Sequence, residues 1–340
     1  MIGIRRAEIK DIPMIMDFLD EHWLKGYALA RDREFFDWHF VKNGKVNIWI
    51  GVDDEEGKMY AMEGAILYND LPHPDFSACL WIAPKCDVPM LGLKVSETEL
   101  KELDIRAGFA LGLSDQAVKI QRRLHKPVFP MDHYYILNDL SEYKIAKIVK
   151  KDIHAVEDNG YTLEYVSDPG RMREVISPSM LTDYSPHKDY EYVEWRYFRH
   201  PIFKYDMWAI KDQNNVDVGA IFTREEYANG KVAAKIVDYY GDNAEIRNLG
   251  YALYKLVKEK GYEYIDIYSY GVDVTEYEKA GFIRCDENSE NIIPNSFQPY
   301  LCKNISLYMI EPLAENSRLF RGDADQDKPR FAKNYTPENE

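Results

Sequence analysis

The sequence predicts an α+β protein made of two domains in tandem, each a mixed, mostly antiparallel sheet flanked by helices. Three observations carry this prediction. Segments of the two halves repeat at a nearly constant separation, a strand–helix–strand unit lies in the second half, and helices precede an antiparallel hairpin in the first half. The chain has 340 residues, 46% of them hydrophobic, which is enough for two domains that each bury a core.

The repeat is clearest around two tryptophans. The segment Glu34-Phe-Phe-Asp-Trp38-His-Phe is similar to Glu191-Tyr-Val-Glu-Trp195-Arg-Tyr, 157 positions later. Unrelated halves would rarely keep so constant an offset over several segments. Three further pairs lie 155 to 159 positions apart: Trp49 with Trp208, Gly64 with Gly219, and Gly92 with Gly250.

The repeat and the composition predict four parts of the chain. A first copy occupies residues 1–145, a polar, lysine-rich connector 146–160, and a second copy 161–311. The end of the first copy is expected to supply the last strand of its own sheet. Residues 312–340 lose apolar periodicity and are expected to be extended or disordered.

The first copy is expected to begin with a strand at residues 2–6. Asp11 and Pro13 are typical of a helix start, and an aromatic helix or turn follows at residues 33–40. Strands are predicted at residues 46–52, 59–68 and 76–82, the first two joined by an acidic turn.

The second copy contains a predicted parallel strand–helix–strand unit. Residues 232–239 and 263–269 are rich in β-branched and aromatic residues, and apolar residues recur at helical spacing between them. The helix is expected to end at Gly261, after the cations Lys258 and Lys260. A strand, a crossover helix and a strand in one sheet form a right-handed parallel unit.

The start of that helix reads Arg247-Asn-Leu-Gly250-Tyr-Ala252, where unpaired backbone N–H groups can hold an anion. The string resembles the Q/R-x-x-G-x-G/A signature with which acyltransferases of the GNAT superfamily hold the pyrophosphate of coenzyme A. This resemblance implies a cofactor site formed by Arg247, Asn248, Gly250, Tyr251 and Ala252, with Tyr239 on the preceding strand. Without a ligand, Gly250 is interpreted as a glycine that lets two segments pack closely.

A second motif, Tyr277-Glu-Lys-Ala-Gly281-Phe282, is similar to the Y-x-x-x-G-F segment of the same superfamily. The resemblance implies that Tyr277 protonates the leaving thiolate and that Asp238, on the strand before the helix, is the base. The alternatives are that Tyr277 is a half-buried aromatic residue and that Asp238 is a surface residue at a strand end.

The acceptor is expected to meet a loop and a helix end earlier in the second copy. Tyr184 lies in the loop, and Arg196 and His200 form a cationic cluster suited to a diphosphate or carboxylate. The alternative is a solvated helix end before Pro201. The first copy has Pro89 where the second has Arg247, so we expect it to be degenerate, serving a structural or acceptor-binding role.

Composition restricts the partners. A formal net charge of −15 disfavours a nucleic-acid partner. The sequence contains no run of eighteen apolar residues, so membrane insertion is not expected. Four scattered cysteines indicate reduced thiols, and no metal-ligand spacing is found, so no metal is predicted. The protein is expected to be cytoplasmic, with self-association left open.

Most of the chain resembles tandem GNAT-superfamily proteins of the kind found among bacterial surface-polysaccharide biosynthesis proteins. The resemblance implies a coenzyme A-dependent N-acyltransferase that uses acetyl-CoA as co-substrate and a small amine, such as an amino sugar or sugar nucleotide, as acceptor. One alternative is a non-catalytic GNAT-like binding or scaffold protein. A second is an aminoacyl-tRNA-dependent aminoacyltransferase of the peptidoglycan-bridge type, which the acidic charge balance disfavours.

Overall fold

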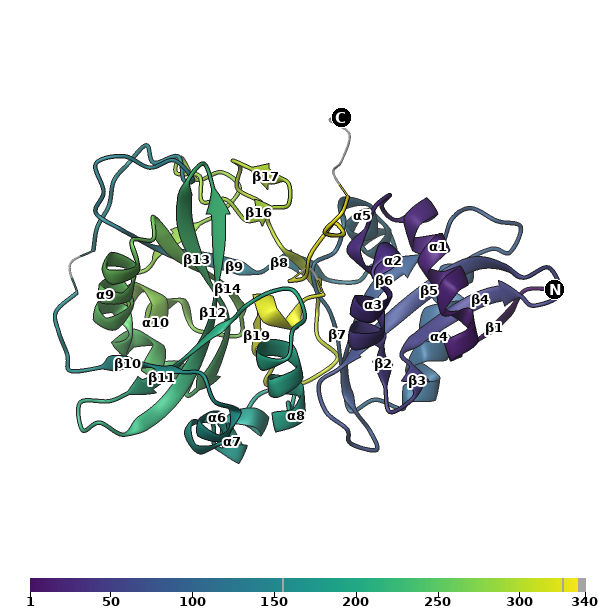
Figure 1. Ribbon diagram of the computed structural model, residues 1–340, viewed down its shortest axis with the longest axis horizontal. Helices are drawn as coiled ribbons and strands as arrows, with labels where there is room; N and C mark the ends of the chain where they lie inside the picture. The colour runs from purple at the N-terminus through teal and green to yellow at the C-terminus, as the bar shows by residue number, and fades with distance from the viewer. Residues whose placement is uncertain (155, 326, 336–340) are drawn as a thin grey trace. The chain divides into compact units, whose positions relative to one another are not determined.

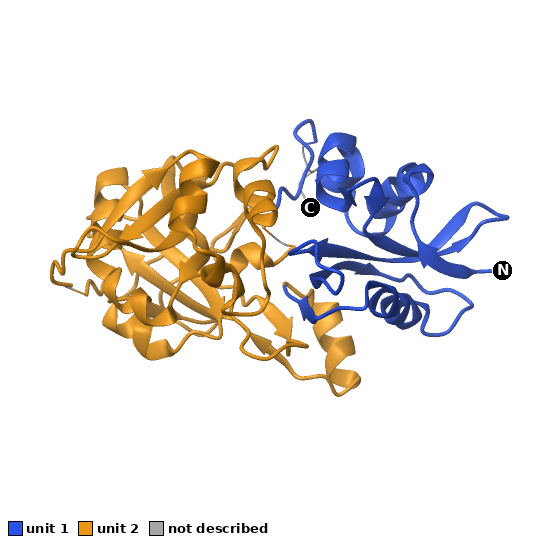
Figure 2. Cartoon of the chain, turned by 90° about the horizontal axis from the view of Figure 1, so that it is seen from below, with its two compact units in different colours: residues 1–111, 328–340 blue, residues 112–327 orange. Residues whose placement is uncertain are grey.

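A computed structural model describes residues 1–154, 156–325 and 327–335 (Figure 1). The chain divides into two compact units, coloured separately in Figure 2. Unit 1 contains residues 1–111 with the described residues from 328 onward, and unit 2 contains residues 112–327.

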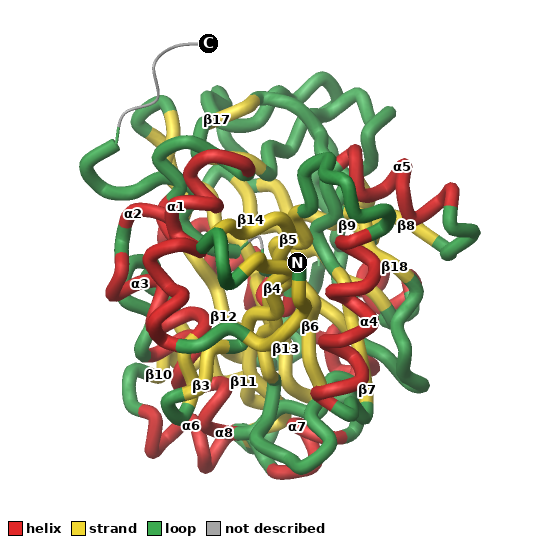
Figure 3. Tube along the Cα trace, turned by 90° about the vertical axis from the view of Figure 1, so that its right-hand side faces the viewer, coloured by secondary structure: helices red, strands yellow, loops and turns green. Residues whose placement is uncertain are grey.

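Unit 1 is a five-stranded sheet with helices on both faces (Figure 3). The sheet order is β1-β4-β5-β6-β7, and only the β6/β7 pair is parallel. Its strands are β1 (Gly3–Arg6), β4 (Ile48–Asp53), β5 (Lys58–Leu67), β6 (Asp75–Ile82) and β7 (Ala107–Ala110), with a small β2/β3 hairpin (Val41–Lys42, Lys45–Val46). Its helices are η1 (Ile9–Asp11), α1 (Ile12–His22), α2 (Ala28–Arg31), α3 (Arg33–Phe40) and α4 (Leu91–Leu103).

Local signals place several of these elements. Proline lies in the first turn of α1, where no intrahelical N–H is needed, and the Asp32 side chain caps α3 by accepting a hydrogen bond from the Phe35 N–H at 2.9 Å. Helix α4 crosses from β6 to β7 and buries Leu91 and Val95 against Trp49 of β4. The aromatic helix predicted over residues 33–40 is therefore α3.

Unit 2 is built on a longer sheet. The strand order is β10-β11-β12-β13-β14-β9-β15, and β13/β14 is its parallel pair. These strands are β9 (Asp132–Leu137), β10 (Thr162–Val166), β11 (Asp206–Lys211), β12 (Asp217–Ala228), β13 (Lys231–Gly241), β14 (Tyr264–Tyr270) and β15 (Ile283–Cys285). Shorter strands are β8 (Val128–Pro130), β16 (Ser296–Phe297), β17 (Tyr300–Leu301), β18 (Tyr308–Ile310) and β19 (Leu319–Phe320).

The first five strands of this sheet, β10 to β14, follow the same order and directions as the five strands of unit 1. Helix α9 crosses from β13 to β14 as α4 crosses from β6 to β7, and it ends at Gly261, whose φ of 68° suits glycine. The helices of unit 2 are α5 (Asp115–Arg123), α6 (Pro169–Val175), α7 (Pro178–Thr182), α8 (Tyr190–Val193), the π-helical turn η2 (Glu194–Phe198), η3 (Asn243–Asn248), α9 (Gly250–Lys260), α10 (Val274–Lys279) and η4 (Arg321–Asp323).

The boundary between the units lies at residue 111 rather than at the expected 145. Strand β9, which lies within the predicted first copy, belongs to the sheet of unit 2, between β14 and β15, and pairs antiparallel with both. The chain is also packed rather than solvated where the connector begins, because the backbone N–H groups of Lys144, Ile145 and Ala146 donate to the buried Glu263 carboxylate at 2.7 to 3.1 Å.

The described residues of the tail are ordered and pack against the protein, which excludes the disordered alternative there. Strand β19 pairs antiparallel with β14, and Asp323 and Asp327 are buried. Composition alone could not predict this, because an acidic string is typical of solvated chain unless buried cations elsewhere in the sequence neutralise it. Residues 336–340 lie outside the described residues.

No helix in the described part of the chain combines the length and apolar character that crossing a bilayer requires. All four cysteines are free thiols.

Candidate functional site

Each unit contains a parallel strand pair that stops pairing partway along. In unit 1, β6 and β7 pair from Asp75 with Ala107 to Ala78 with Ala110. Strand β6 then continues to Ile82, and on the β7 side no described strand pairs with its last three residues. We call this edge, Leu80–Ile82, the unit 1 opening.

A bulge accompanies the divergence in both units. Opposite β5, strand β6 carries one extra residue between Cys79 and Ile82, and Leu80 there has a φ of 50°. Opposite β12, strand β13 carries one extra residue, Val237, between Ile236 and Asp238. A bulge bends its strand and turns backbone groups away from the neighbouring strand. This explains why the pairing with the parallel strand ends at the same level.

The corresponding opening of unit 2 is filled by the chain itself. Strands β13 and β14 pair only from Ala234 to Ile236 on β13, and beyond this level β14 pairs with β19. The Arg318 guanidinium, next to β19, donates to the Tyr239 carbonyl at 3.2 Å and to the Gly241 carbonyl at 2.6 Å. Arg318 of the tail thus hydrogen-bonds the carbonyl groups on the edge of β13 that a ligand could otherwise contact.

Two predicted site residues surround this arginine. The Arg318 guanidinium carbon lies 3.9 Å from the ring centroid of Tyr184 and 5.2 Å from that of Tyr239. The Tyr239 hydroxyl donates to the Asp242 carbonyl at 2.5 Å, and burial raises the pKa of Tyr239 well above its usual value. Tyr184 and Tyr239 are therefore brought together, but around the protein's own side chain.

The glycine of the predicted phosphate-binding turn meets another part of the chain. A Cβ added to Gly250 would lie 2.1 Å from the carbonyl oxygen of Ala280, at the end of α10. This contact fits the interpretation of Gly250 as a close-packing glycine. Ala252 is buried in the same helix, and Tyr251 is partly exposed.

The polar residues before α9 are paired within unit 2. The Arg247 guanidinium makes two hydrogen bonds of 2.5 Å to the Glu276 carboxylate. The Asn248 amide donates to Glu245 at 3.0 Å and to the Tyr161 hydroxyl at 3.2 Å. These contacts occupy the side chains of Arg247 and Asn248, two of the residues that the resemblance placed at the pyrophosphate.

Tyr277, the predicted acid, lies in the hydrophobic core. It is 1% exposed, its ring stacks on Tyr134 at a centroid distance of 4.4 Å, and its hydroxyl donates to the Ser269 hydroxyl at 2.8 Å. Burial raises the pKa of Tyr277 well above its usual value. The half-buried alternative is therefore wrong, and the role of Tyr277 as the acid stays a prediction.

Asp238, the predicted base, is 0% exposed and belongs to a buried charge cluster. Its carboxylate accepts hydrogen bonds from Lys188 Nζ at 2.7 Å and from the Tyr197 hydroxyl at 2.8 Å. Burial would lower the pKa of Lys188, but Asp238 and Asp323, whose carboxylate also lies 2.7 Å from the ammonium, raise it overall. Asp238 is thus not a surface residue, and its carboxylate is already paired.

Arg196 also turns out to be buried rather than part of a solvated helix end. It is 4% exposed and donates to the carbonyls of Gly322 at 3.2 Å and Asp327 at 2.9 Å. The Asp327 carboxylate accepts further bonds from Arg224 at 2.7 Å and Arg321 at 3.2 Å. Burial would raise the pKa of Asp327, but the three arginines hold it far below its usual range.

His200 is also buried and forms hydrogen bonds within the protein. Its Nδ1 accepts hydrogen bonds from the backbone N–H groups of Ile202 and Phe203 at 3.1 and 2.8 Å, so the ring organises the turn after η2. Arg196 therefore binds backbone carbonyls of the tail, and His200 stabilises the turn that follows it. Within the described residues, no group of three or more histidines, cysteines or carboxylates is placed to hold a metal ion.

The unit 1 opening adjoins the start of helix α4, in the copy that the sequence predicts to be degenerate. Helix α4 begins after Met90, which has a φ of 57°, and no described side chain caps its first N–H groups. The Trp81 indole donates to the Gly92 carbonyl at 3.0 Å, so the end of β6 and the first turn of α4 are in contact. A Cβ on Gly92 would lie 2.8 Å from the Ala83 Cβ, which explains the glycine. The sequence repeat already aligns Gly92 with Gly250, but Pro89 in the place of Arg247 led to the expectation of a degenerate copy.

No protein-family model matches the sequence, and no curated protein does. Among solved structures, a GCN5-related N-acetyltransferase from Anabaena variabilis is 11% identical with a TM-score of 0.56, covering 91% of this chain and 72% of that one. A conserved Enterococcus faecalis protein of unknown function, named as a probable N-acyltransferase, is 10% identical with a TM-score of 0.54, covering 91% and 73%.

A third similar structure is the GCN5-related glucosamine N-acetyltransferase region of a fungal multi-domain β-N-acetylglucosaminidase. It is 10% identical with a TM-score of 0.52, and the match covers 91% of this chain and 38% of that one. At such low identity, shared architecture is what these likenesses establish. The chain has the GNAT-like α+β fold, with mostly antiparallel sheets flanked by helices.

Proposed function

We propose that the protein is a coenzyme A-dependent N-acyltransferase that takes acetyl-CoA as co-substrate and binds it at the unit 1 opening. The observation that carries the proposal is the edge Leu80–Ile82, which pairs with no described strand on the β7 side, beside the uncapped first turn of α4. Three similar solved structures are named as N-acetyl- or N-acyltransferases, which supports the same activity class.

The two backbone features suit the two polar parts of acetyl-CoA. An unpaired strand edge can hydrogen-bond an extended amide chain as another strand would. The free N–H groups and the dipole at the start of α4 favour a pyrophosphate, and Lys85 and Lys94 add positive charge nearby in sequence. Acetyl-CoA would supply an activated acyl group, and the protein's part is to hold it in line with an amine.

Under this proposal unit 2 has the structural or acceptor-binding role first expected of the other copy. Its opening is occupied by β19 and Arg318, and the predicted catalytic pair Tyr277 and Asp238 is buried. The same observations favour a second candidate, a GNAT-like binding protein without turnover. Amino sugars and sugar nucleotides remain the acceptors to test first.

The donor site can be tested by isothermal titration calorimetry with acetyl-CoA on two variants of one residue. Asn and Asp are similar in size and are both tolerated at a positive φ, so Met90→Asn and Met90→Asp should fold as well as the wild type. Only Asp adds a negative charge where the pyrophosphate would lie. We expect Met90→Asp to weaken binding at least tenfold and Met90→Asn to change it less than threefold.

A matched pair in unit 2 makes the assignment falsifiable. Tyr251 lies in the first turn of α9, so Tyr251→Glu would weaken binding relative to Tyr251→Gln if unit 2 held the donor. That result would overturn the assignment to unit 1. Absence of acetyl-CoA binding by the wild type would contradict the function itself, whereas binding without thiol release in an acceptor screen would favour the binding protein.

A further inference from the structure

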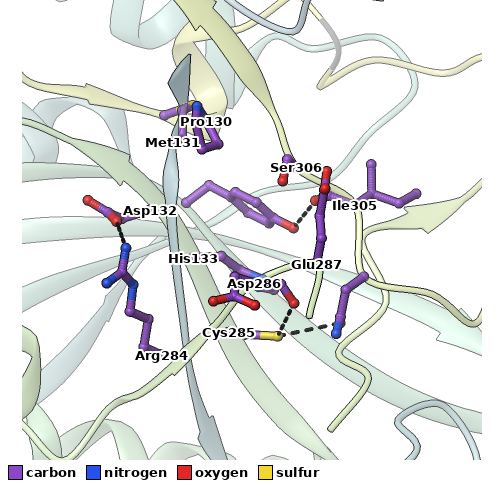
Figure 4. A pocket seen from close by; sticks show the side chains of 12 residues that line it. Pro130, Met131, Asp132, His133, Arg284, Cys285, Asp286, Glu287, Ile305 and Ser306 are labelled. Carbon is purple, nitrogen blue, oxygen red and sulfur yellow. Dashed lines mark hydrogen bonds and ion pairs between the residues drawn. The ribbon is translucent and has the colours of Figure 1, made fainter. Parts of the chain in front are cut away.

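A small cavity lies in unit 2 where β9 begins and β15 ends (Figure 4). Its volume is about 50 Å³, and its lining includes His133, Asp286, Glu287 and Ser306. A water molecule occupies about 30 Å³ in the liquid, so the cavity has room for one ammonium or hydroxyl group with a short carbon stem.

The buried histidine of this cavity is held from behind by a carboxylate. His133 is 5% exposed, its Nε2 lies 2.9 Å from the Asp266 carboxylate, and its ring stacks on Tyr268 at 3.9 Å. Lys235 Nζ also contacts Asp266, at 2.9 Å. Because an ionised carboxylate can only accept, Nε2 carries the ring proton and Nδ1 keeps a lone pair. The hydrogen bond to Asp266 uses Nε2, so it leaves the Nδ1 lone pair available to a ligand.

The charges around the ring keep it neutral and the cavity mouth acidic. Burial lowers the pKa of His133, as do Lys235 and Arg321, against the opposing effect of Asp266. Burial would raise the pKa of Asp266, but Lys235 and His133 lower it overall. At the mouth, Arg284 is paired with Asp132 at 3.0 Å, which leaves the exposed carboxylates of Asp286 and Glu287 without a cation among the lining residues.

We propose that this cavity binds the ammonium group of a small primary amine, which donates a hydrogen bond to His133 Nδ1 while Glu287 and Asp286 face its positive charge. A neutral ring acceptor at the floor and carboxylates at the rim are complementary to a cationic donor and would repel an anion. The inference goes beyond the proposed function, because it holds whether or not unit 1 binds acetyl-CoA.

The test is long-range proton–nitrogen NMR of the imidazoles in the full-length protein, with methylammonium chloride as the probe. The His133 signals are those that disappear in His133→Gln. We expect the Nε2–H tautomer in the free protein and a saturable shift of Nδ1 on titration. Ammonium chloride should give a smaller shift at equal concentration, because it lacks the carbon stem, and tetramethylammonium, which has no N–H and is too large, should give none.

Two variants of the same loop distinguish the loss of a carboxylate that lines the cavity from the general effect of removing one negative charge. Glu287→Gln should raise the dissociation constant for methylammonium about two- to fivefold, the range of an exposed ion pair. Glu290→Gln, which removes an exposed charge outside the lining, should leave it unchanged. An Nδ1–H tautomer, a shift that never saturates, or equal shifts with tetramethylammonium would overturn the proposal.

Discussion

At the scale of single residues, the repeated glycines Gly92 and Gly250 share a helix start but meet different neighbours. A Cβ at Gly250 would lie 2.1 Å from a backbone oxygen, whereas at Gly92 it would lie 2.8 Å from a side-chain Cβ. Neither a carbonyl oxygen nor an alanine Cβ can move without its backbone, so the much shorter approach at Gly250 is the costlier one. We therefore expect Gly250→Ala to lower the free energy of unfolding by about 1–3 kcal/mol, as overpacking does, and Gly92→Ala to cost less.

Urea denaturation of the two variants measures this difference directly. Equal losses in both would contradict the close approach of α9 and α10. The sequence could predict a glycine requirement at Gly250, since R-x-x-G-x-A at a helix start calls for a close neighbour. It could not tell whether that neighbour is a ligand or the chain, because Ala280 is brought there by the tertiary fold.

At the scale of elements, β19 closes the opening between β13 and β14, and Arg318 is its main polar link to β13. Arg318→Met keeps the length of the side chain and removes the donors to two buried carbonyls. We expect the free energy of unfolding to fall by about 2–3 kcal/mol, the cost of leaving such groups unpaired. Thermal or urea unfolding of Arg199→Met, which breaks an exposed ion pair with Glu191, is the control and should change by less than about 0.5 kcal/mol.

No loss of stability in Arg318→Met would mean that β19 does not hold the opening closed. Strand β19 is also an element that the sequence alone does not predict. Helix α3 and the end of α9 at Gly261 follow from caps and periodicity within a few residues, so local patterns predicted them. Strands β9 and β19 pair with a strand far away in the chain, and no local pattern encodes those partners.

At the scale of the whole molecule, unit 2 is unusual in burying paired charges: Asp327 lies among Arg196, Arg224 and Arg321, and Asp266 beside Lys235. Both aspartates have pKa values below those of the unfolded chain. A carboxyl whose pKa is lowered by folding stabilises the native state above its unfolded pKa of about 3.9, and this contribution is lost as the pH falls toward the folded value.

The free energy of unfolding should therefore be nearly constant from pH 7 to about pH 5 as far as these groups are concerned, and it should fall steeply below about pH 4. Urea unfolding at a series of pH values, followed by hydrogen exchange of β13 and β14 amides, measures the effect in unit 2. Glu290→Gln, an exposed residue, should leave the acid limb unchanged. A native state that keeps its full stability at pH 3 would mean that these carboxylates are not held ionised by their arginine and lysine partners, because protonating them would then cost nothing.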